Sequence, residues 1–145
     1  KGIFSDALLL FDKVQETHQK ISVIGRSLGS GVAVYLASKR PLHKMALITP
    51  YDSIKSLGQN KFIIFPVSLL LKDKYDSLRR VKHIQTQTIA LVAENDEVIP
   101  KKHSLRLINE FPPEQITAIT INNSGHNDIS YKEEYYRHLK DFFNY

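Results

Sequence analysis

One pentapeptide in this sequence has the residue types and the spacing of a nucleophilic serine. Residues 25–29 read Gly-Arg-Ser-Leu-Gly, and they lie between a β-branched run at residues 21–24 and a segment rich in small residues. In a sharp strand-to-helix turn the serine hydroxyl projects from the sheet, and the two glycines avoid side-chain clashes. We therefore expect Ser27 to be a nucleophile, and the Leu28 N–H to serve as the donor to a developing oxyanion.

The alternative for this turn is a nucleotide-binding loop with an idle serine. Such a loop needs a second phosphate-binding element, for example a Gly-Lys-Ser sequence. No Gly-Lys-Ser occurs in the chain, which favours the nucleophile.

A serine hydroxyl reacts well only when a neighbouring base removes its proton. His126 follows a predicted strand at residues 116–121 by a turn of sequence Asn-Asn-Ser-Gly, which suits a loop that presents a side chain over a sheet edge. We predict that His126 is the base. The other histidines lie in or beside predicted helices or at the far ends of strands, and we expect surface or packing roles for them: His18, His43, His83, His103 and His138.

The base in turn needs a carboxylate that fixes its tautomer and stabilises the imidazolium. Asp96 follows the predicted strand at residues 88–93, just before a helix that Pro100 opens. This position is at the carboxyl end of a strand, the same edge that carries Ser27 and His126. We therefore predict that Asp96 is the acid of a Ser-His-Asp triad.

Four other carboxylates compete with this assignment. Glu94 and Glu97 share the loop of Asp96, and we predict them to be solvated loop charges. Asp52 follows the preceding strand and is the alternative acid, although we expect it to cap a helix instead. Asp128 lies two residues beyond the base and is predicted to cap the final helix.

The elements that position these side chains alternate between helices and strands. Such alternation indicates right-handed crossovers and a parallel sheet that binds ligands at its carboxyl edge. The fold class is therefore α/β, with a parallel sheet of about four strands flanked by helices. The expected strands are residues 21–24, 45–49, 88–93 and 116–121; the expected helices are residues 5–18, a helix directly after the turn, one from Pro100 and one along the stripe from Tyr131 to Phe142.

Residues 52–84 separate the second and third predicted strands without a strand of their own. Their first part ends in the apolar run Phe62–Leu71, and residues 76–84 read as a basic amphipathic helix. The insertion is either a cap whose apolar side lines an acyl pocket or a crossover helix that packs on the sheet.

The composition fits one domain over residues 1–145, since 42% of the residues are apolar and 24% are charged. The chain has no cysteine, which excludes disulfides and thiolate metal sites. The net charge of +5 favours anionic partners only weakly, and we expect no nucleic-acid partner. The longest apolar run, Phe62–Leu71, is far shorter than the roughly 20 residues of a transmembrane helix.

The chain order serine, aspartate, histidine is that of the α/β-hydrolases. Residues 25–31, 94–100 and 124–128 resemble the three catalytic motifs of small α/β-hydrolase serine hydrolases. The segments are similar to those of esterases and acyl-protein thioesterases, including membrane-associated depalmitoylases. The resemblance implies an acyl ester or thioester substrate, no metal or organic cofactor, and peripheral membrane contact. It implies these roles: nucleophile Ser27, acid Asp96, base His126 and oxyanion donor Leu28.

The same resemblance implies that the fold lacks its N-terminal strands, because the family has several strands before the serine turn. The strand at residues 21–24 is then an exposed edge, which invites pairing. We expect the other half of the fold or a strand-paired second copy to cover it. The family's second oxyanion donor comes from the absent part, and its loss costs about a hundredfold to a thousandfold in turnover, so we expect weak or no activity from this chain alone.

Two other classes of function remain open at this stage. A non-catalytic interaction module could keep the fold and bind a partner through the apolar insertion or the open edge. An oligopeptidase-type peptidase domain resembles an esterase in this region. An intact triad argues against the first, and an additional N-terminal domain would indicate the second.

Overall fold

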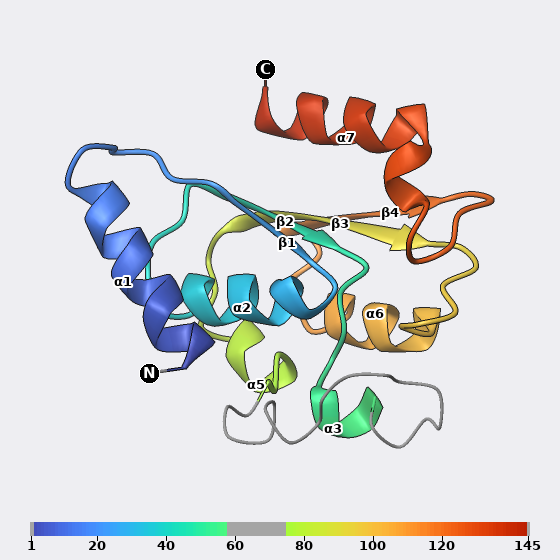
Figure 1. Ribbon diagram of the computed structural model, residues 1–145, viewed down its shortest axis with the longest axis horizontal. Helices are drawn as coiled ribbons and strands as arrows, with labels where there is room; N and C mark the ends of the chain where they lie inside the picture. The colour runs from blue at the N-terminus through green and yellow to red at the C-terminus, as the bar shows by residue number, and fades with distance from the viewer. Residues whose placement is uncertain (1, 58–74, 145) are drawn as a thin grey trace.

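The computed structural model describes residues 2–57 and 75–144, and it contains one parallel sheet between two layers of helices (Figure 1). The strands are β1 (Val23–Arg26), β2 (Lys44–Ile48), β3 (Gln87–Ala93) and β4 (Ile116–Ile121). They are neighbours in chain order, β1-β2-β3-β4, and each adjacent pair is parallel. The predicted α/β class with a four-stranded parallel sheet is confirmed.

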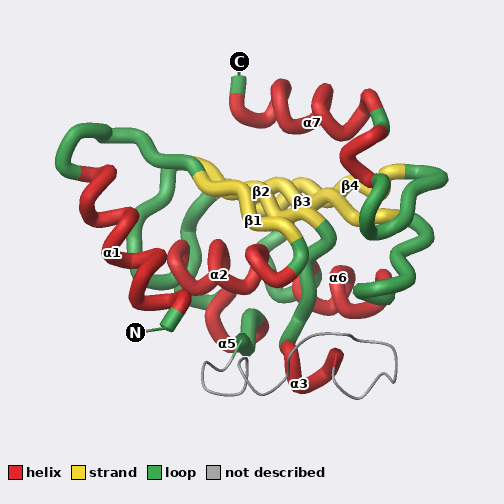
Figure 2. Tube along the Cα trace, viewed as in Figure 1, coloured by secondary structure: helices red, strands yellow, loops and turns green. Residues whose placement is uncertain are grey.

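Helices cover the two faces of the sheet unequally (Figure 2). On one face lie α1 (Ile3–Gln15), α2 (Leu28–Ala37) and α6 (Lys101–Ile108), and beyond them, further from the sheet, lie the single turns α3 (Ile54–Leu57) and α5 (Leu78–Val81). The 3-10 turn η1 (Ile129–Tyr131) leads into α7 (Glu133–Phe143), which crosses the opposite face. The sheet therefore lies between two helical layers, and side chains at its edges stand between them.

Burial on both faces explains why the strands read as continuous apolar runs. In β2, Met45 and Leu47 pack into the core shared with α1, α2 and α6, whereas Ala46 and Ile48 pack into the core under α7. All four side chains are fully buried. A sheet that is covered on both faces has no polar alternation along its central strands.

The two ends of the segment between β2 and β3 are tied together. Ser53 and Asp76 form an antiparallel bridge, and the Ser77 N–H donates to the Asp52 carbonyl at 2.9 Å. The helix predicted over residues 76–84 is only the single turn α5. The choice between a cap and a crossover helix depends on residues 58–74, which lie outside the described residues, as does the apolar run at 62–71.

The sheet order leaves β1 at an edge, as predicted. Within residues 2–57 and 75–144 no strand pairs with the outer side of β1, and the Ile24 side chain there is 54% exposed. A hollow of about 400 Å³ lies between β1, α1 and α2, with apolar walls that include Leu10, Phe11 and Val32. None of the described helices is long and apolar enough to cross a bilayer.

Candidate active site

Ser27 stands at the end of β1 in a strained turn. Its backbone φ of 51° and ψ of −122° are uncommon for a residue with a side chain, and such strain is concentrated at functional sites. Its N–H donates to the Ile48 carbonyl of the neighbouring strand at 2.9 Å. Its carbonyl accepts from the Ser30 N–H at 2.9 Å and from Ser30 Oγ at 2.7 Å. Hydrogen bonds on both sides therefore hold the strained conformation in place.

The two glycines of the turn differ in what they allow. A Cβ on Gly25 would lie 2.5 Å from the Gly29 carbonyl oxygen and 2.7 Å from the Ala33 Cβ, because α2 crosses directly over β1 here. A Cβ on Gly29 would meet no atom of the described residues within 4 Å. The expectation that both glycines avoid clashes is right for Gly25 and wrong for Gly29.

The structure brings Ser27, His126 and Asp96 into one hydrogen-bonded chain. His126 Nε2 lies 2.9 Å from Ser27 Oγ, and His126 Nδ1 lies 2.9 Å from Asp96 Oδ2 and 3.0 Å from Asp96 Oδ1. The side chains of His126 and Asp96 are 7% and 1% exposed. These residues come from the ends of β1, β3 and β4, so one sheet edge collects side chains up to 99 residues apart in the sequence.

Backbone donors fix the orientation of Asp96. Its Oδ1 accepts from the N–H groups of Val98 at 2.9 Å and Ile99 at 2.6 Å. An ionised carboxylate only accepts hydrogen bonds, so the Nδ1 of His126 must carry the proton that it shares with Asp96. His126 Nε2 is then the acceptor for the Ser27 hydroxyl, which is the tautomer that a base requires.

Leu28 follows Ser27 as the first residue of α2. Its N–H has no acceptor within the helix and lies at the positive end of the helix dipole. An oxyanion on a carbon bound to Ser27 Oγ would form next to this donor. The arrangement can therefore supply a nucleophile, a base, an orienting acid and one oxyanion donor.

A model of the serine hydrolase family FSH1 matches residues 5–127. The chain belongs to this serine hydrolase family. The chain is 30% identical over 109 residues to an uncharacterized protein of Mycobacterium tuberculosis, a match that covers 75% of this chain and 38% of that protein. It is 25% identical over 148 residues to the alpha/beta hydrolase domain-containing protein aho-3 of Caenorhabditis elegans, covering 98% of this chain and 42% of that one.

Solved structures agree with the family at the level of the fold. The alpha/beta hydrolase enzyme MGS-MChE2, from a lagoon-sediment metagenome of Mar Chica, Morocco, superposes with a TM-score of 0.73 at 17% identity. The superposition covers 95% of this chain and 68% of that one. The chain spans about two fifths of the length of the two curated relatives above. Its fold corresponds to part of an α/β-hydrolase domain.

Asp52 belongs to a second polar cluster and not to the hydrogen-bonded chain of Ser27. Its fully buried carboxylate lies 3.1 Å from His103 Nδ1 and accepts from Arg106 Nη1 at 2.9 Å. It also accepts from Ser56 Oγ. The helix cap predicted for Asp52 is provided by Ser53, whose Oγ accepts from the Ser56 N–H at 3.1 Å. Asp52 instead joins the end of β2 to α6.

Replacing Asp52 with alanine will lower the free energy of unfolding by about 3 kcal/mol. The substitution removes a buried carboxylate and with it the interaction that this carboxylate makes with the buried imidazole of His103. Arg106 adds little to the loss, since its side chain is 54% exposed and can turn to water. Urea denaturation measures the change. The control is Asp12→Ala, which removes the exposed pair of Asp12 with Arg40 and should cost much less. Equal losses in the two variants would contradict the role given to Asp52.

The loop of His126 is held by carboxylates whose contacts the sequence did not reveal. Glu94 and Glu97 are exposed, as predicted, but Glu94 Oε2 also accepts from the Asn123 N–H at 2.7 Å and Glu97 Oε2 from the His126 N–H at 3.3 Å. Asp128 Oδ1 accepts from the Gly125 N–H at 2.5 Å and does not cap α7, which begins at Glu133. The prediction for Asp128 is wrong because this residue closes its own loop.

An apolar cluster borders the serine turn on the side of α3 and α5. Leu28 and Val98 pack against it, and Tyr51 Oη donates to the Leu28 carbonyl at 3.4 Å. Burial, and then the neighbouring Tyr75, raise the pKa of the Tyr51 phenol, so it stays protonated and does not compete with His126 as a base. The buried members of the cluster are Phe4, Tyr51, Ile54, Leu57, Tyr75 and Ile99.

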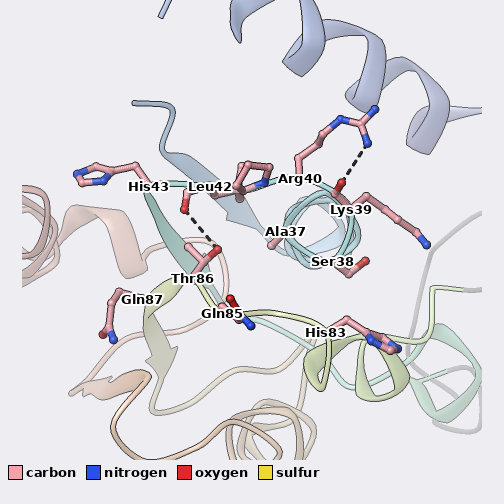
Figure 3. A pocket seen from close by; sticks show the side chains of 11 residues that line it. Ala37, Ser38, Lys39, Arg40, Leu42, His43, His83, Gln85, Thr86 and Gln87 are labelled. Atoms are coloured by element: carbon pink, nitrogen blue, oxygen red, sulfur yellow. Dashed lines mark hydrogen bonds between the residues drawn. The ribbon is translucent and has the colours of Figure 1, made fainter. Parts of the chain in front are cut away.

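A second hollow, of about 500 Å³, lies at the opposite edge of the sheet. His43 and His83 lie on two sides of it, and Leu42 and Thr86 precede the starts of β2 and β3 (Figure 3). The hollow is therefore at the amino ends of the strands, away from Ser27. Among the described residues no three His, Asp or Glu side chains gather as ligands for a metal ion.

Proposed function

We propose that the protein carrying this chain hydrolyses carboxylic esters or thioesters through an acyl-enzyme on Ser27. One observation carries the proposal: the unbroken contact from Ser27 Oγ through the ring of His126 to the buried Asp96 carboxylate. A hydroxyl 2.9 Å from a correctly oriented imidazole nitrogen is within reach for proton transfer. Membership of a serine hydrolase family supports the same reaction type.

In the first half-reaction Ser27 Oγ forms a bond to the substrate carbonyl carbon while His126 Nε2 takes the hydroxyl proton. The carbonyl oxygen becomes an oxyanion and accepts a hydrogen bond from the Leu28 N–H. Asp96 stabilises the imidazolium that forms. When the oxyanion collapses, the bond to the alcohol oxygen or thiol sulfur breaks, and His126 returns its proton to the leaving group.

In the second half-reaction water attacks the acyl-serine carbonyl, and His126 Nε2 takes a proton from this water. Collapse of the second oxyanion releases the carboxylic acid, and His126 returns the proton to Ser27 Oγ. The enzyme is regenerated without a cofactor in either step.

The apolar cluster beside the serine turn supports an acyl substrate. Leu28 and Val98, which follow the nucleophile and the acid in the sequence, both pack against buried aliphatic and aromatic side chains. An acyl chain that leaves the carbonyl on this side would meet apolar surface, and each buried methylene contributes about 0.8 kcal/mol.

The open side of β1 has a place in the same proposal. We propose that further strands of the same fold cover it in the working enzyme, where they would also supply a second oxyanion donor; a strand-paired second copy is the alternative occupant. Without a second donor the chain is expected to turn over about a hundredfold to a thousandfold more slowly.

A fluorophosphonate probe tests the proposal, because it reacts covalently only with an activated serine. We expect the probe to label Ser27 alone, as read by mass spectrometry of the digested protein. The negative control is Ser27→Ala. The matched control is Ser38→Ala, which removes a hydroxyl at the other end of α2 and should leave labelling intact. Absence of labelling in the folded protein that carries this chain would refute the proposed function.

Matched substrates then separate the reaction classes. An oxygen ester, a thioester and an amide of one acyl group present the same acyl chain and differ only in the leaving group. We expect turnover of the ester or the thioester to exceed that of the amide. Faster amide cleavage would indicate the peptidase alternative.

A further inference from the structure

The residues next to Ser27 and next to Asp96 hold the backbone of His126. Arg26 directly precedes Ser27, and its Nη2 donates to the His126 carbonyl at 2.9 Å and to the Asn127 carbonyl at 3.3 Å. Glu97 directly follows Asp96, and its carboxylate accepts from the His126 N–H at 3.3 Å. Side chains at the ends of two different strands therefore hydrogen-bond the His126 backbone: Glu97, after β3, accepts from its N–H, and Arg26, on β1, donates to its carbonyl.

The direction of the Arg26 side chain follows from the pleat of β1. Gly25 faces α2, so Arg26 points to the opposite face of the sheet, where α7 lies. The pKa of Tyr135 in α7 agrees with this placement: burial raises it, and the nearby Arg26 cation acts in the opposite direction. Arg26 therefore lies between β1, α7 and the loop of His126.

Other hydrogen bonds hold the first part of this loop. The Asn95 N–H donates to the Ser124 carbonyl at 2.9 Å, and Ser124 Oγ donates to the Ile121 carbonyl at 2.7 Å. These bonds connect the loop to the ends of β3 and β4. The Arg26 guanidinium connects it to β1, the strand that carries the nucleophile. The strand order β1-β2-β3-β4 separates β1 from β4 by the full width of the sheet. The hydrogen bonds of Arg26 therefore link the first strand to the loop that follows the last one.

We propose that Arg26 is a positioning residue for His126: its guanidinium joins the backbone of the base to the strand of the nucleophile and so keeps Nε2 close to Ser27 Oγ. The inference rests on the proposed function. The hydrogen bonds of Arg26 go to backbone carbonyls and not to Ser27 Oγ or the imidazole nitrogens, so its effect passes through the His126 backbone. One guanidinium nitrogen, Nη2, donates to both adjacent carbonyls, and the planar group holds this donor in a fixed direction.

The consequence is a loss of turnover with little change in substrate binding. A misplacement of about 1 Å at the reacting groups costs about a hundredfold in rate. We expect Arg26→Gln to lower kcat about 10- to 100-fold with KM unchanged, and to lower the rate of fluorophosphonate labelling by the same factor. Arg26→Lys should restore part of this loss.

The experiment measures kcat per active site in the protein that carries this chain, with active sites counted by fluorophosphonate titration. A purely structural role would reduce the number of sites and leave kcat per site unchanged. The matched control is Arg137→Gln, which removes the same charge from an exposed position of α7 and should retain the kcat of the wild type.

Each outcome decides the matter. If the probe does not label the wild-type protein, the proposed function and this inference are both refuted. A labelled wild type with an unchanged kcat per site in Arg26→Gln, or an equal fall in Arg137→Gln, would overturn the role of Arg26 alone. Should Arg26→Gln fail to fold, Arg26→Met removes the charge and the N–H donors but keeps an unbranched aliphatic stem; a kcat per site equal to that of the wild type in this variant would equally overturn it.

Discussion

Replacing Asp96 with asparagine will lower kcat about 10⁴-fold with little change in the fold. The Asp96 Oδ1 accepts from the N–H groups of Val98 and Ile99, so the single oxygen of an asparagine would be retained by these donors. The amide nitrogen would then face His126 Nδ1 and donate to it. The ring proton would move to Nε2, which points at Ser27 Oγ, and His126 could no longer accept the serine proton.

The measurement is kcat with an ester substrate, together with the rate of fluorophosphonate labelling. The control is Asp141→Asn, the same chemical change at an exposed position of α7, and it should leave both rates near those of the wild type. Thermal unfolding followed by circular dichroism verifies that the Asp96→Asn variant is folded. A loss of less than tenfold would show that Asp96 does not set the tautomer of His126.

The residues of the site could be predicted because each one follows the end of a strand, Ser27 at once and Asp96 and His126 after short turns. Parallel strands bring their carboxyl ends to one edge, so a serine, an aspartate and a histidine after three such strands must come close together. The β-branched run predicts a strand at residues 21–24 that ends at Gly25, whereas β1 is Val23–Arg26. Pairing with the neighbouring strand continues past the glycine to the Ser27 N–H.

The contacts that surround the site could not be predicted, because they join segments whose approach depends on the whole fold. Asp52 pairs with His103 and Arg106 since the start of α6 packs over the end of β2, and no local pattern encodes that packing. The hydrogen bond of Arg26 to the His126 carbonyl spans 100 positions in the sequence. An arginine beside a predicted nucleophile was the only available signal.

Apolar spacing predicts only part of the buried face of the helix after Pro100. The pattern puts Leu105, Ile108 and Phe111 on one side; Ile108 and Phe111 are buried, but Leu105 is 41% exposed and Leu107 is fully buried instead. The buried polar residues His103 and Ser104 occupy the inner face of α6, and Ser104 Oγ donates to the Pro50 carbonyl at 2.6 Å. A helix that places polar side chains inward has a weaker apolar stripe, so its orientation depends on hydrogen-bond partners from other segments.

The second large effect concerns the glycine before the nucleophile. Replacing Gly25 with alanine will lower the free energy of unfolding by about 3 kcal/mol, because the new Cβ would overlap the Gly29 carbonyl and the Ala33 Cβ. None of the described glycines has a positive φ, so the cost is purely steric. The overlap pushes α2 away from β1 and moves Ser27, which stands between them. We expect kcat to fall by about a hundredfold or more.

Gly29→Ala is the matched control within the same pentapeptide. A Cβ at Gly29 meets no described atom within 4 Å, and alanine favours a helix over glycine by up to about 1 kcal/mol. The free energy of unfolding should therefore stay the same or rise, and labelling of Ser27 should persist. Urea denaturation and fluorophosphonate labelling of the two variants decide the point. If both variants lose stability and labelling alike, the turn is sensitive to any added side chain; if only Gly25→Ala does, the close approach of α2 to β1 is what sets the position of the nucleophile.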